Sequence, residues 1–457
     1  MSDLYGRLLA NALFPAFEAV RGRPTVPLVD YLHRTERWTP DELRDLQTGL
    51  ARRLLRHCYQ HTDYYRQVMH ERGVSPENIR SLLDLGKLPL LDRPTLRRTM
   101  EARTAKVPPA AVIRKTTSGS SGDPAEVLYN AESRHWRDAT RWRAYGWGGY
   151  RIGMRAMHYW GFVPAATSTF WKRSKIMADR FFKRDCYIDC TPRSPEALAN
   201  VVEEIERFRP DVIVAYASGA GALAKFINDN GLRTWHPIPV LTGAEKLLLH
   251  DRNEIERAFG PAFDTYGCRE VMLLGSECEA HDGLHTSMEN LVVELIVRQP
   301  DGSTRPAQAG ETGEVAITDL HNLACPMVRY LNGDLAVARG DDLCACGRGL
   351  VRIGPVQGRT TETMCDGEGN PVGGLVFNIL FSSIGHVAKA FQVVQRRDRS
   401  VIFKVVPWQG ECLPQREESI LRAHAERYLP GAPFTIELVD HIPLSAAGKR
   451  RVVVVER

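Results

Sequence analysis

The stretch SPEALANVVEEIERFRPDVIVAY, residues 194–216, contains a helix and a strand in direct succession. Ser194 and Pro195 are typical of the start of a helix. Apolar residues then recur at helical spacing, namely Leu198, Val201, Val202, Ile205 and Phe208. The apolar run that ends at Tyr216 indicates a buried strand. The stretch therefore predicts α/β architecture, in which ligand-binding loops lie at the ends of strands.

The same alternation of helix and strand continues after this stretch. A helix is predicted after Gly219, a strand over residues 238–241, a further helix that ends at Phe259, and a strand over residues 262–266. Residues 106–285 are therefore predicted to form an α/β core.

The regions on either side of the core have different patterns. Residues 1–105 are predicted to be a helical subdomain, because residues 39–42 form a capping box with proline in the first turn. Residues 286–360 contain strand-like runs and are predicted to be β-rich. These parts together make a large N-terminal domain, residues 1–360. Residues 361–457 are predicted to form a small, mobile α+β lid, with strands over 391–395, 401–406 and 434–439 and a helix over 415–428.

Length and composition limit the class of protein. The chain has 457 residues, which exceeds the size at which one core keeps growing. Hydrophobic residues at 43% and charged residues at 25% are ordinary globular values. The apolar runs are strand-sized, so we expect no membrane span and a cytoplasmic location. The net charge of +5 comes from scattered basic residues, which argues against a nucleic-acid partner.

A loop rich in hydroxyls and glycines, TTSGSSGDP, occupies residues 116–124. Glycines allow successive backbone N–H groups to turn toward an anion, and the hydroxyls add further donors. The loop is not a Walker motif, because Asp123 and Pro124 follow the last glycine. Taken alone, a loop of this composition is far more often a turn or a linker than a phosphate-binding loop. As a phosphate-binding loop for ATP, its ligands are Thr117, Ser118, Gly119, Ser120, Ser121 and Gly122.

Further short motifs follow in order along the chain. They are Thr242-Gly243-Ala244-Glu245, Asp264-Thr265-Tyr266-Gly267-Cys268-Arg269-Glu270, Arg329-Tyr330-Leu331-Asn332-Gly333-Asp334, Gly358-Arg359 and Pro443-Leu444-Ser445-Ala446-Ala447-Gly448-Lys449. With the phosphate loop, this ordered set resembles the adenylate-forming (ANL) superfamily over essentially the whole chain. The branch that the chain resembles is the phenylacetate-CoA ligase-like proteins of the CapK type.

The resemblance implies a role for each motif. Lys449 would bridge the substrate carboxylate and the α-phosphate, and Glu270 would hold the magnesium that offsets the triphosphate charge. Asp334 would accept the ribose hydroxyls, and Arg359 would steady the ribose or the α-phosphate. Residues on the adenine side of the nucleotide would be Gly243, Ala244, Glu245, Asp264, Tyr266 and Gly267.

The resemblance implies an AMP-forming ligase that uses ATP and Mg²⁺ to convert a carboxylic acid to an acyl adenylate and then to a thioester of CoA. Many members carry Asp-Asp at the pivot after Gly358-Arg359, whereas this chain has Thr361-Glu362. Transfer to an amine, a hydroxyl or a carrier protein therefore remains an alternative, as does a nucleotide-binding homologue without turnover. A homodimer is a further possibility.

Cysteine and histidine spacing suggests a metal site. Cys278, His285, Cys344 and Cys346 offer three thiolates and an imidazole, which is the ligand set of a closed tetrahedral zinc. The phenylacetate-CoA ligase-like proteins often show the same pattern, which implies a structural zinc. His281 is a competing ligand, and the alternative is that reduced cysteines pack in the core.

The sequence is least specific about the residues that would bind the substrate acid. Aromatic residues cluster around His158 and Tyr159, and Tyr216 and Ser218 fall at the end of a predicted strand. Ligands gather at such strand ends, so these four residues are candidates for binding an aromatic or medium-sized acid. The alternative is that the aromatic residues belong to the core.

Overall fold

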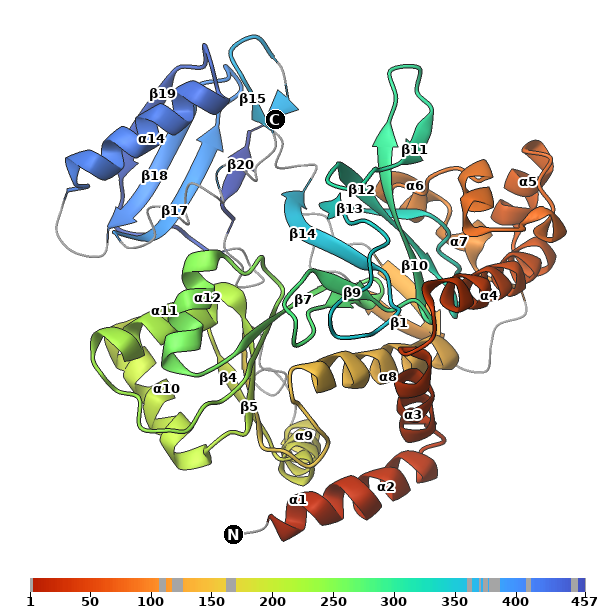
Figure 1. Ribbon diagram of the computed structural model, residues 1–457, viewed down its shortest axis with the longest axis horizontal. Coiled ribbons are helices and arrows are strands. Elements are labelled where there is room, and N and C mark those ends of the chain that lie inside the picture. Colours follow the sequence, from red (N-terminus) through yellow and green to blue (C-terminus); the bar gives the residue numbers. More distant parts are fainter. Residues whose placement is uncertain are drawn as a thin grey trace. The chain divides into compact units, whose positions relative to one another are not determined.

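The computed structural model describes residues 3–106, 112–116, 126–161, 170–359, 364–369, 371–372, 377, 387–407, 412–444 and 451–456 (Figure 1). The chain forms two compact units, each built from two segments. The first unit contains Met1–Met154 and Phe263–Val356, and the second contains Arg155–Ala262 and Gln357–Arg457. The domain boundary predicted at residue 360 remains a prediction.

The first unit begins with helices, as the sequence predicts. Thr39 closes a complete capping box with Glu42 at the start of the longest of them, and Leu43 and Leu54 of that helix are fully buried. The helices are α1 (Leu4–Leu8), α2 (Phe14–Val20), α3 (Thr25–Thr35), α4 (Pro40–His61), α5 (Asp63–Glu71), α6 (Arg93–Arg98) and α7 (Met100–Arg103).

The sheet of the first unit is largely antiparallel. Its strand order is β11-β10-β12-β13-β14-β9-β8-β7, and helix α8 (Ala131–Trp147) contacts β8. The strands are β7 (Ala262–Cys268), β8 (Met272–Ser276), β9 (Leu284–Thr286), β10 (Leu291–Arg298), β11 (Thr304–Pro306), β12 (Thr312–Asp319), β13 (Tyr330–Ala338) and β14 (Arg352–Arg359). The β-rich character predicted for this region is therefore present.

A separate hairpin flanks the predicted phosphate loop. Strands β1 (Val112–Thr116) and β2 (Glu126–Asn130) pair antiparallel, with Thr116 opposite Glu126. The candidate phosphate ligands 117–122 lie between these strands, outside the described residues. The hairpin brings the two ends of that segment to adjacent positions.

The second unit contains a parallel sheet and a smaller sheet. The parallel strands run in the order β6-β5-β3-β4, with α10 following β4 along the chain. These elements are β3 (Ala156–Trp160), α9 (Phe170–Lys183), β4 (Asp185–Asp189), α10 (Pro195–Phe208), β5 (Val212–Tyr216), α11 (Ala217–Asp229), β6 (Val240–Gly243) and α12 (Leu249–Ala258). The helix and strand predicted within residues 194–216 are thus confirmed as α10 and β5.

The smaller sheet of the second unit has the order β19-β18-β17-β20. Phe391, Phe403 and Leu421 are completely buried in its core. Its elements are β17 (Ala388–Gln395), β18 (Val401–Pro407), α14 (Gln415–Tyr428), β19 (Phe434–Leu438) and β20 (Val453–Val455). The two-stranded pair β15 (Met364–Cys365) and β16 (Pro371–Val372) precedes it. The α+β composition predicted for this region matches these elements.

Two boundaries differ from the sequence-based expectation. Helix α11 begins at Ala217 rather than after Gly219, because the small residues there allow the helix to pack closely: a Cβ on Gly219 would lie 3.0 Å from the Cβ of Cys190. Strand β6 begins at Val240 rather than at residue 238. The Pro239 carbonyl accepts a hydrogen bond from the Ile213 N–H. Pro239 itself has no N–H, so it cannot donate a hydrogen bond to a neighbouring strand.

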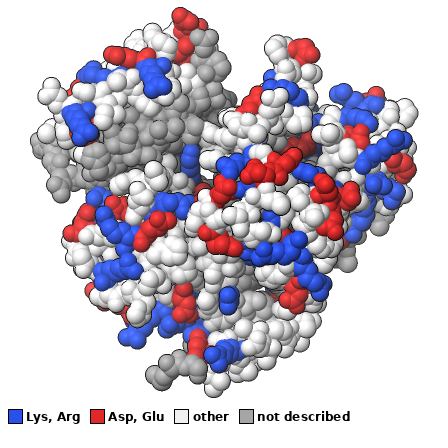
Figure 2. All heavy atoms as spheres, viewed as in Figure 1, with Lys and Arg blue, Asp and Glu red and all other residues white. Residues whose placement is uncertain are grey.

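The surface carries both signs of charge. Basic and acidic side chains are interspersed over the face seen in Figure 2. Within the part of the chain that the structure describes, no helix is both long enough and apolar enough to cross a membrane.

The close approach of β7 to β8 at Gly267 predicts that the fold is sensitive to substitution of this glycine. A Cβ on Gly267 would lie 2.1 Å from the carbonyl oxygen of Met272. We expect Gly267→Ala to lower the free energy of unfolding by about 2 kcal/mol or more, because the backbone of one of the two strands would have to move to make room for the methyl group. Gly146→Ala is the control, because no atom lies within 4 Å of its Cβ position in α8. The control is expected to stabilise slightly. Equal denaturation midpoints for wild type and Gly267→Ala would contradict the prediction.

Candidate active site and metal centre

A buried hydrogen-bonded group joins two of the predicted motifs within the first unit. The Tyr266 hydroxyl donates to Asp334 Oδ2 at 2.7 Å. The Asn332 amide nitrogen lies 2.7 Å from the Tyr266 hydroxyl oxygen and 2.8 Å from Asp334 Oδ2. The backbone N–H of Asp334 donates to Asn332 Oδ1 at 3.0 Å. Because β7 supplies Tyr266 and β13 supplies the other two residues, the sheet itself fixes the orientation of the carboxylate.

The electrostatics of this group keep the phenol protonated. Burial raises the pKa of Tyr266 well above its usual value, and the negative charge of Asp334 raises it further. A phenol that retains its proton remains a donor. The tyrosine therefore remains a hydrogen-bond donor to Asp334.

Glu270 stands next to this group. The Tyr330 hydroxyl donates to Glu270 Oε1 at 3.2 Å, and both side chains are buried. Burial raises the pKa of the Cys268 thiol, and the charges of Glu270 and Asp334 add to this effect. Cys268 therefore lies within the electrostatic influence of both carboxylates.

Two residues of the motif at 329–334 have backbone conformations that favour glycine. Arg329 has a φ of 53°, and Gly333 has a φ of 85°. The Arg329 guanidinium is held by Glu294, with nitrogen to oxygen distances of 3.2 Å, and by the carbonyl of Leu88 at 2.7 Å. These contacts support the strained residue at the entry to β13.

The other predicted nucleotide ligands lie elsewhere. Asp264 is in β7, and its backbone exchanges two hydrogen bonds with Glu277, each 2.9 Å long. Gly243, Ala244 and Glu245 lie in the second unit, where Ala244 has a φ of 67°. Arg359 ends β14, and its side chain is outside the described part of the structure, as is Lys449.

The four candidate acid-binding residues all belong to the second unit. Ser218 accepts from Arg193 at 3.0 Å, and its backbone N–H donates to Glu245 Oε2 at 3.1 Å. Tyr216 packs edge-on against Trp160, with ring centroids 4.5 Å apart. His158 stacks on Tyr187 with centroids 4.3 Å apart. Tyr159 lies in the hydrophobic core and is only 1% exposed. Of the four candidates, Ser218 therefore contacts the predicted adenine-side residue Glu245, whereas Tyr159 belongs to the core.

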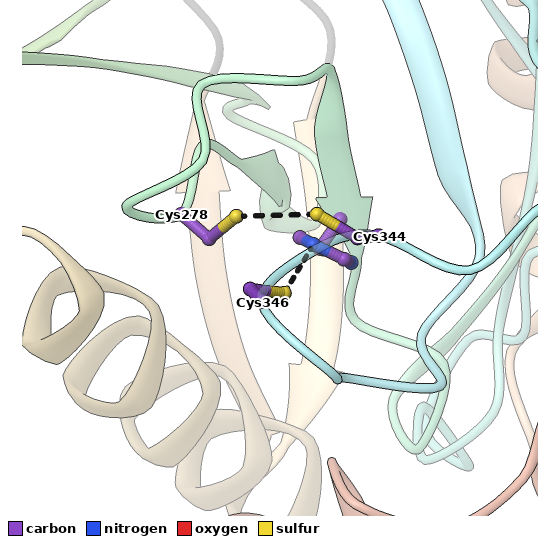
Figure 3. A group of neighbouring side chains, drawn as sticks. Cys278, Cys344 and Cys346 are labelled. Atoms are coloured by element: carbon purple, nitrogen blue, oxygen red, sulfur yellow. Dashed lines mark hydrogen bonds between the residues drawn. The ribbon is translucent and has the colours of Figure 1, made fainter.

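The predicted zinc ligands come together in the first unit. The ligand atoms of Cys278, His285, Cys344 and Cys346 all lie within 4.8 Å of one another. Cys278 Sγ is 3.7 Å from Cys344 Sγ, and Cys346 Sγ is 3.4 Å from His285 Nε2. Figure 3 shows the three sulfur atoms converging from two loops. Zinc–ligand distances of about 2.0–2.3 Å in a tetrahedron require ligand separations of about 3.3–3.8 Å, so the donor set fits a zinc ion.

The surroundings of the cluster also fit a metal. His285 Nδ1 lies 2.9 Å from the carbonyl oxygen of Leu350, which leaves Nε2 to face the thiols. Burial lowers the pKa of His285 to about 4, so the ring is a neutral ligand near pH 7. His281, the competing ligand, instead lies 3.1 Å from Glu277.

A network of aromatic and charged residues supports the cluster. The Arg348 guanidinium lies over the Trp147 ring, 4.9 Å from its centroid, and pairs with Glu279 at 2.8 Å and Glu36 at 3.3 Å. The Trp147 indole N–H donates to Glu36 at 3.0 Å. The loop that carries Cys344 and Cys346 is thereby held to the N-terminal helices.

Sequence reasoning assigned no role to several residues that complete these sites. Asn332 and Tyr330 lie inside a predicted motif, but only the structure shows that they orient Asp334 and Glu270. Glu36 is separated from Arg348 by 312 positions, so no local pattern could pair them. The Asn-Gly-Asp sequence of residues 332–334 was the one available signal, because Asn-Gly favours a turn.

Comparisons with known proteins give consistent results. Phenylacetate-coenzyme A ligase of Escherichia coli is 31% identical over 344 residues, which cover 71% of this chain and 72% of that protein. The enzyme of the same name from Thermus thermophilus is 28% identical over 366 residues, which cover 78% of this chain and 79% of that protein. No family model matches the sequence.

A solved structure shares the fold. 2-Hydroxyisobutyryl-CoA ligase in its postadenylation state, in complex with R3-HIB-AMP, has a TM-score of 0.72 and 18% identity. The match covers 93% of this chain and 92% of that chain. Crystal structures of the same enzyme in an open conformation match with a TM-score of 0.59. This likeness establishes the α/β fold with its smaller second sheet.

Proposed function

The chain belongs to the phenylacetate-coenzyme A ligase family of adenylate-forming enzymes, and from this premise we propose that it activates a carboxylic acid with ATP and transfers the acyl group to CoA. It is an AMP-forming ligase. We propose an aromatic acid as its substrate, supported by the name of its curated relatives and by the aromatic residues near β3. The cytoplasmic location and the homodimer remain predictions.

The observation that carries this proposal is the hydrogen bond between Tyr266 and Asp334, which joins two motifs 68 positions apart in one buried site. In the first step, a carboxylate oxygen of the acid attacks the α-phosphorus of ATP, the bond to the bridging oxygen breaks, and pyrophosphate leaves. Asp334 would orient the ribose by accepting from its hydroxyls. Glu270 would hold magnesium, which offsets the negative charge that repels the incoming carboxylate.

In the second step, the sulfur of CoA attacks the acyl carbon, the bond to the phosphate oxygen breaks, and AMP leaves. The phosphate loop, between β1 and β2, would hold the departing pyrophosphate in the first step. Lys449 would carry its positive charge to the place where the carboxylate meets the α-phosphate. We infer that residues 361–457 bring this lysine to the site as a lid.

The experiment that tests the reaction is acid-dependent exchange of labelled pyrophosphate into ATP, run with phenylacetate, benzoate and aliphatic acids. We expect exchange with at least one aromatic acid, followed by AMP release when CoA is added. Exchange with no acid would identify a nucleotide-binding protein without turnover. AMP release that requires an amine or a hydroxyl instead of CoA would replace the proposed acceptor.

Asp334 provides a specific prediction for nucleotide binding. Asp334→Asn keeps the shape of the side chain and can still accept from Tyr266, but it loses the charge that receives ribose hydroxyls. We expect the KM for ATP to rise by about 10- to 100-fold, which corresponds to the loss of a charged hydrogen bond. Asp301→Asn, at an exposed turn, is the control. An unchanged KM in Asp334→Asn, with the fold intact by circular dichroism, would remove Asp334 from the nucleotide site.

We also propose that Cys278, His285, Cys344 and Cys346 bind a structural zinc. Four protein ligands leave no open position for a substrate, so the ion would stabilise the loops and take no part in the reaction. The support is the ligand spacing and the bond from His285 Nδ1 to the Leu350 carbonyl.

A further inference from the structure

Helix α9 exposes large apolar side chains in the second unit. Trp171 is 82% exposed, Phe181 is 84% exposed and Met177 is 57% exposed. At 100° per residue, these three side chains and Ala178 fall within an arc of about 120° around the helix axis. Ser174 also falls within this arc, so the three large apolar side chains lie on one side of the helix with a single small polar residue among them.

Two basic residues border this face, and the helix as a whole is strongly basic. The sequence of α9 contains five basic residues and a single acid, which gives the helix a net charge of +4; the basic residues are Lys172, Arg173, Lys175, Arg180 and Lys183. The acid, Asp179, is paired with Lys183 at 2.8 Å. On the helical wheel, Lys175 lies beside Trp171 at one edge of the face, and Arg173 lies beside Met177 at the other edge.

The opposite side of α9 is attached to the unit. The helix contacts β4, and the Arg180 guanidinium lies over the ring of Tyr187 in β4, 4.3 Å from the centroid. Ile176 is half-buried on the same side. The fold thus holds the helix with its apolar, cation-bordered face outward.

The combination of exposed aromatic rings and positive charge on α9 favours an anionic membrane surface over a second copy of the chain as the partner. A basic amphipathic helix with Trp and Phe on its apolar face is typical of helices that lie in the surface of a bilayer containing anionic lipid. The long basic side chains can extend to the phosphates while the rings enter the headgroup region. A second copy of the same helix would bring two charges of +4 together, so self-association through this face is opposed by repulsion.

We propose that α9 docks this protein on membranes that contain anionic phospholipids, with Trp171 and Phe181 inserted and Arg173 and Lys175 bound to lipid phosphates. No described helix is suited to cross the membrane, so the attachment is peripheral. The proposal does not depend on the catalytic proposal, because it involves no residue of the nucleotide or metal sites.

The test is sedimentation of the full chain with vesicles of phosphatidylcholine, with or without phosphatidylglycerol, in the absence of ATP and CoA. We expect binding to the anionic vesicles that weakens as salt rises. The double variant Trp171→Ser/Phe181→Ser and the double variant Arg173→Gln/Lys175→Gln should each weaken binding by about tenfold or more. Leu83→Ser is the matched control, because Leu83 is 75% exposed in the first unit and has no place in α9.

The remaining outcomes overturn the proposal. Failure of the wild type to bind anionic vesicles at low salt excludes a lipid partner. Equal binding to neutral and anionic vesicles excludes the role of the basic residues. If light scattering shows a dimer that the Trp171→Ser/Phe181→Ser variant converts to a monomer, with no vesicle binding, the face joins two copies of the chain. Melting temperatures of the variants verify that the exposed substitutions leave the fold intact.

Discussion

Replacing Lys449 by alanine is expected to lower the rate of acid-dependent pyrophosphate exchange by about 10²- to 10³-fold. The adenylation step brings a carboxylate against a phosphate, and a single cation placed between them removes much of that repulsion. An alanine leaves both anions uncompensated. The rate is measured with saturating ATP and acid, so that weaker binding of either substrate does not lower it.

The matched control is Lys404→Ala, because Lys404 is the other lysine after residue 400 and lies in β18. It should retain the wild-type rate. A Lys449→Ala enzyme that exchanges pyrophosphate as fast as the wild type would show that another group supplies the cation. A Lys449→Arg variant with partial activity would support a requirement for charge at this position.

Substitution of Cys344 by serine is expected to abolish metal binding and to lower the melting temperature by about 10 °C or more. Cys344 is buried, and its sulfur lies 3.7 Å from that of Cys278. A hydroxyl is a poor zinc ligand, and without the ion the two loops lose their cross-link. Metal content is measured by elemental analysis of protein purified without chelator, together with a thermal melt.

Cys412→Ser is the control for this experiment, since Cys412 is exposed and has no place in the cluster. It should bind metal and melt as the wild type does. Wild-type protein with much less than one equivalent of zinc, and an unchanged melting temperature for Cys344→Ser, would indicate that the cysteines simply pack in the core.

Much of the fold follows from short-range patterns. The capping box at Thr39 and the helix and strand of residues 194–216 were predictable because their signals are local. The first residues of α11, Ala217 to Gly219, were not assigned to that helix, since glycine and serine also mark loops. The need for small residues in this helix comes from tertiary packing: a Cβ on Gly221 would lie 2.4 Å from Asp251, and only the folded chain brings those segments together.

The candidate sites likewise contain some features that were predictable from the sequence and others that were not. The metal cluster follows from ligand types and spacing, and the structure assembles all four residues. Asn332 and Tyr330 were not predictable as supports for Asp334 and Glu270, because side-chain hydrogen bonds across a sheet depend on strand register. The buried pair of Arg143 and Glu289, 2.6 Å apart, was equally invisible from sequence, since the two residues are 146 positions apart.

The first unit is assembled from two segments that are separated by part of the second unit. During synthesis, its N-terminal helices therefore emerge about 200 residues before the β-strands that complete their core. At ribosomal speeds this interval lasts about 10 to 40 s. Leu54, Leu55 and Met69 belong to a cluster built mainly from residues 51–88, but Val292, Leu320 and Val328 of the later segment complete it. We therefore expect a ribosome that stalls before residue 356 to leave a fragment whose core lacks these contributions and which is more prone to aggregate than the full chain.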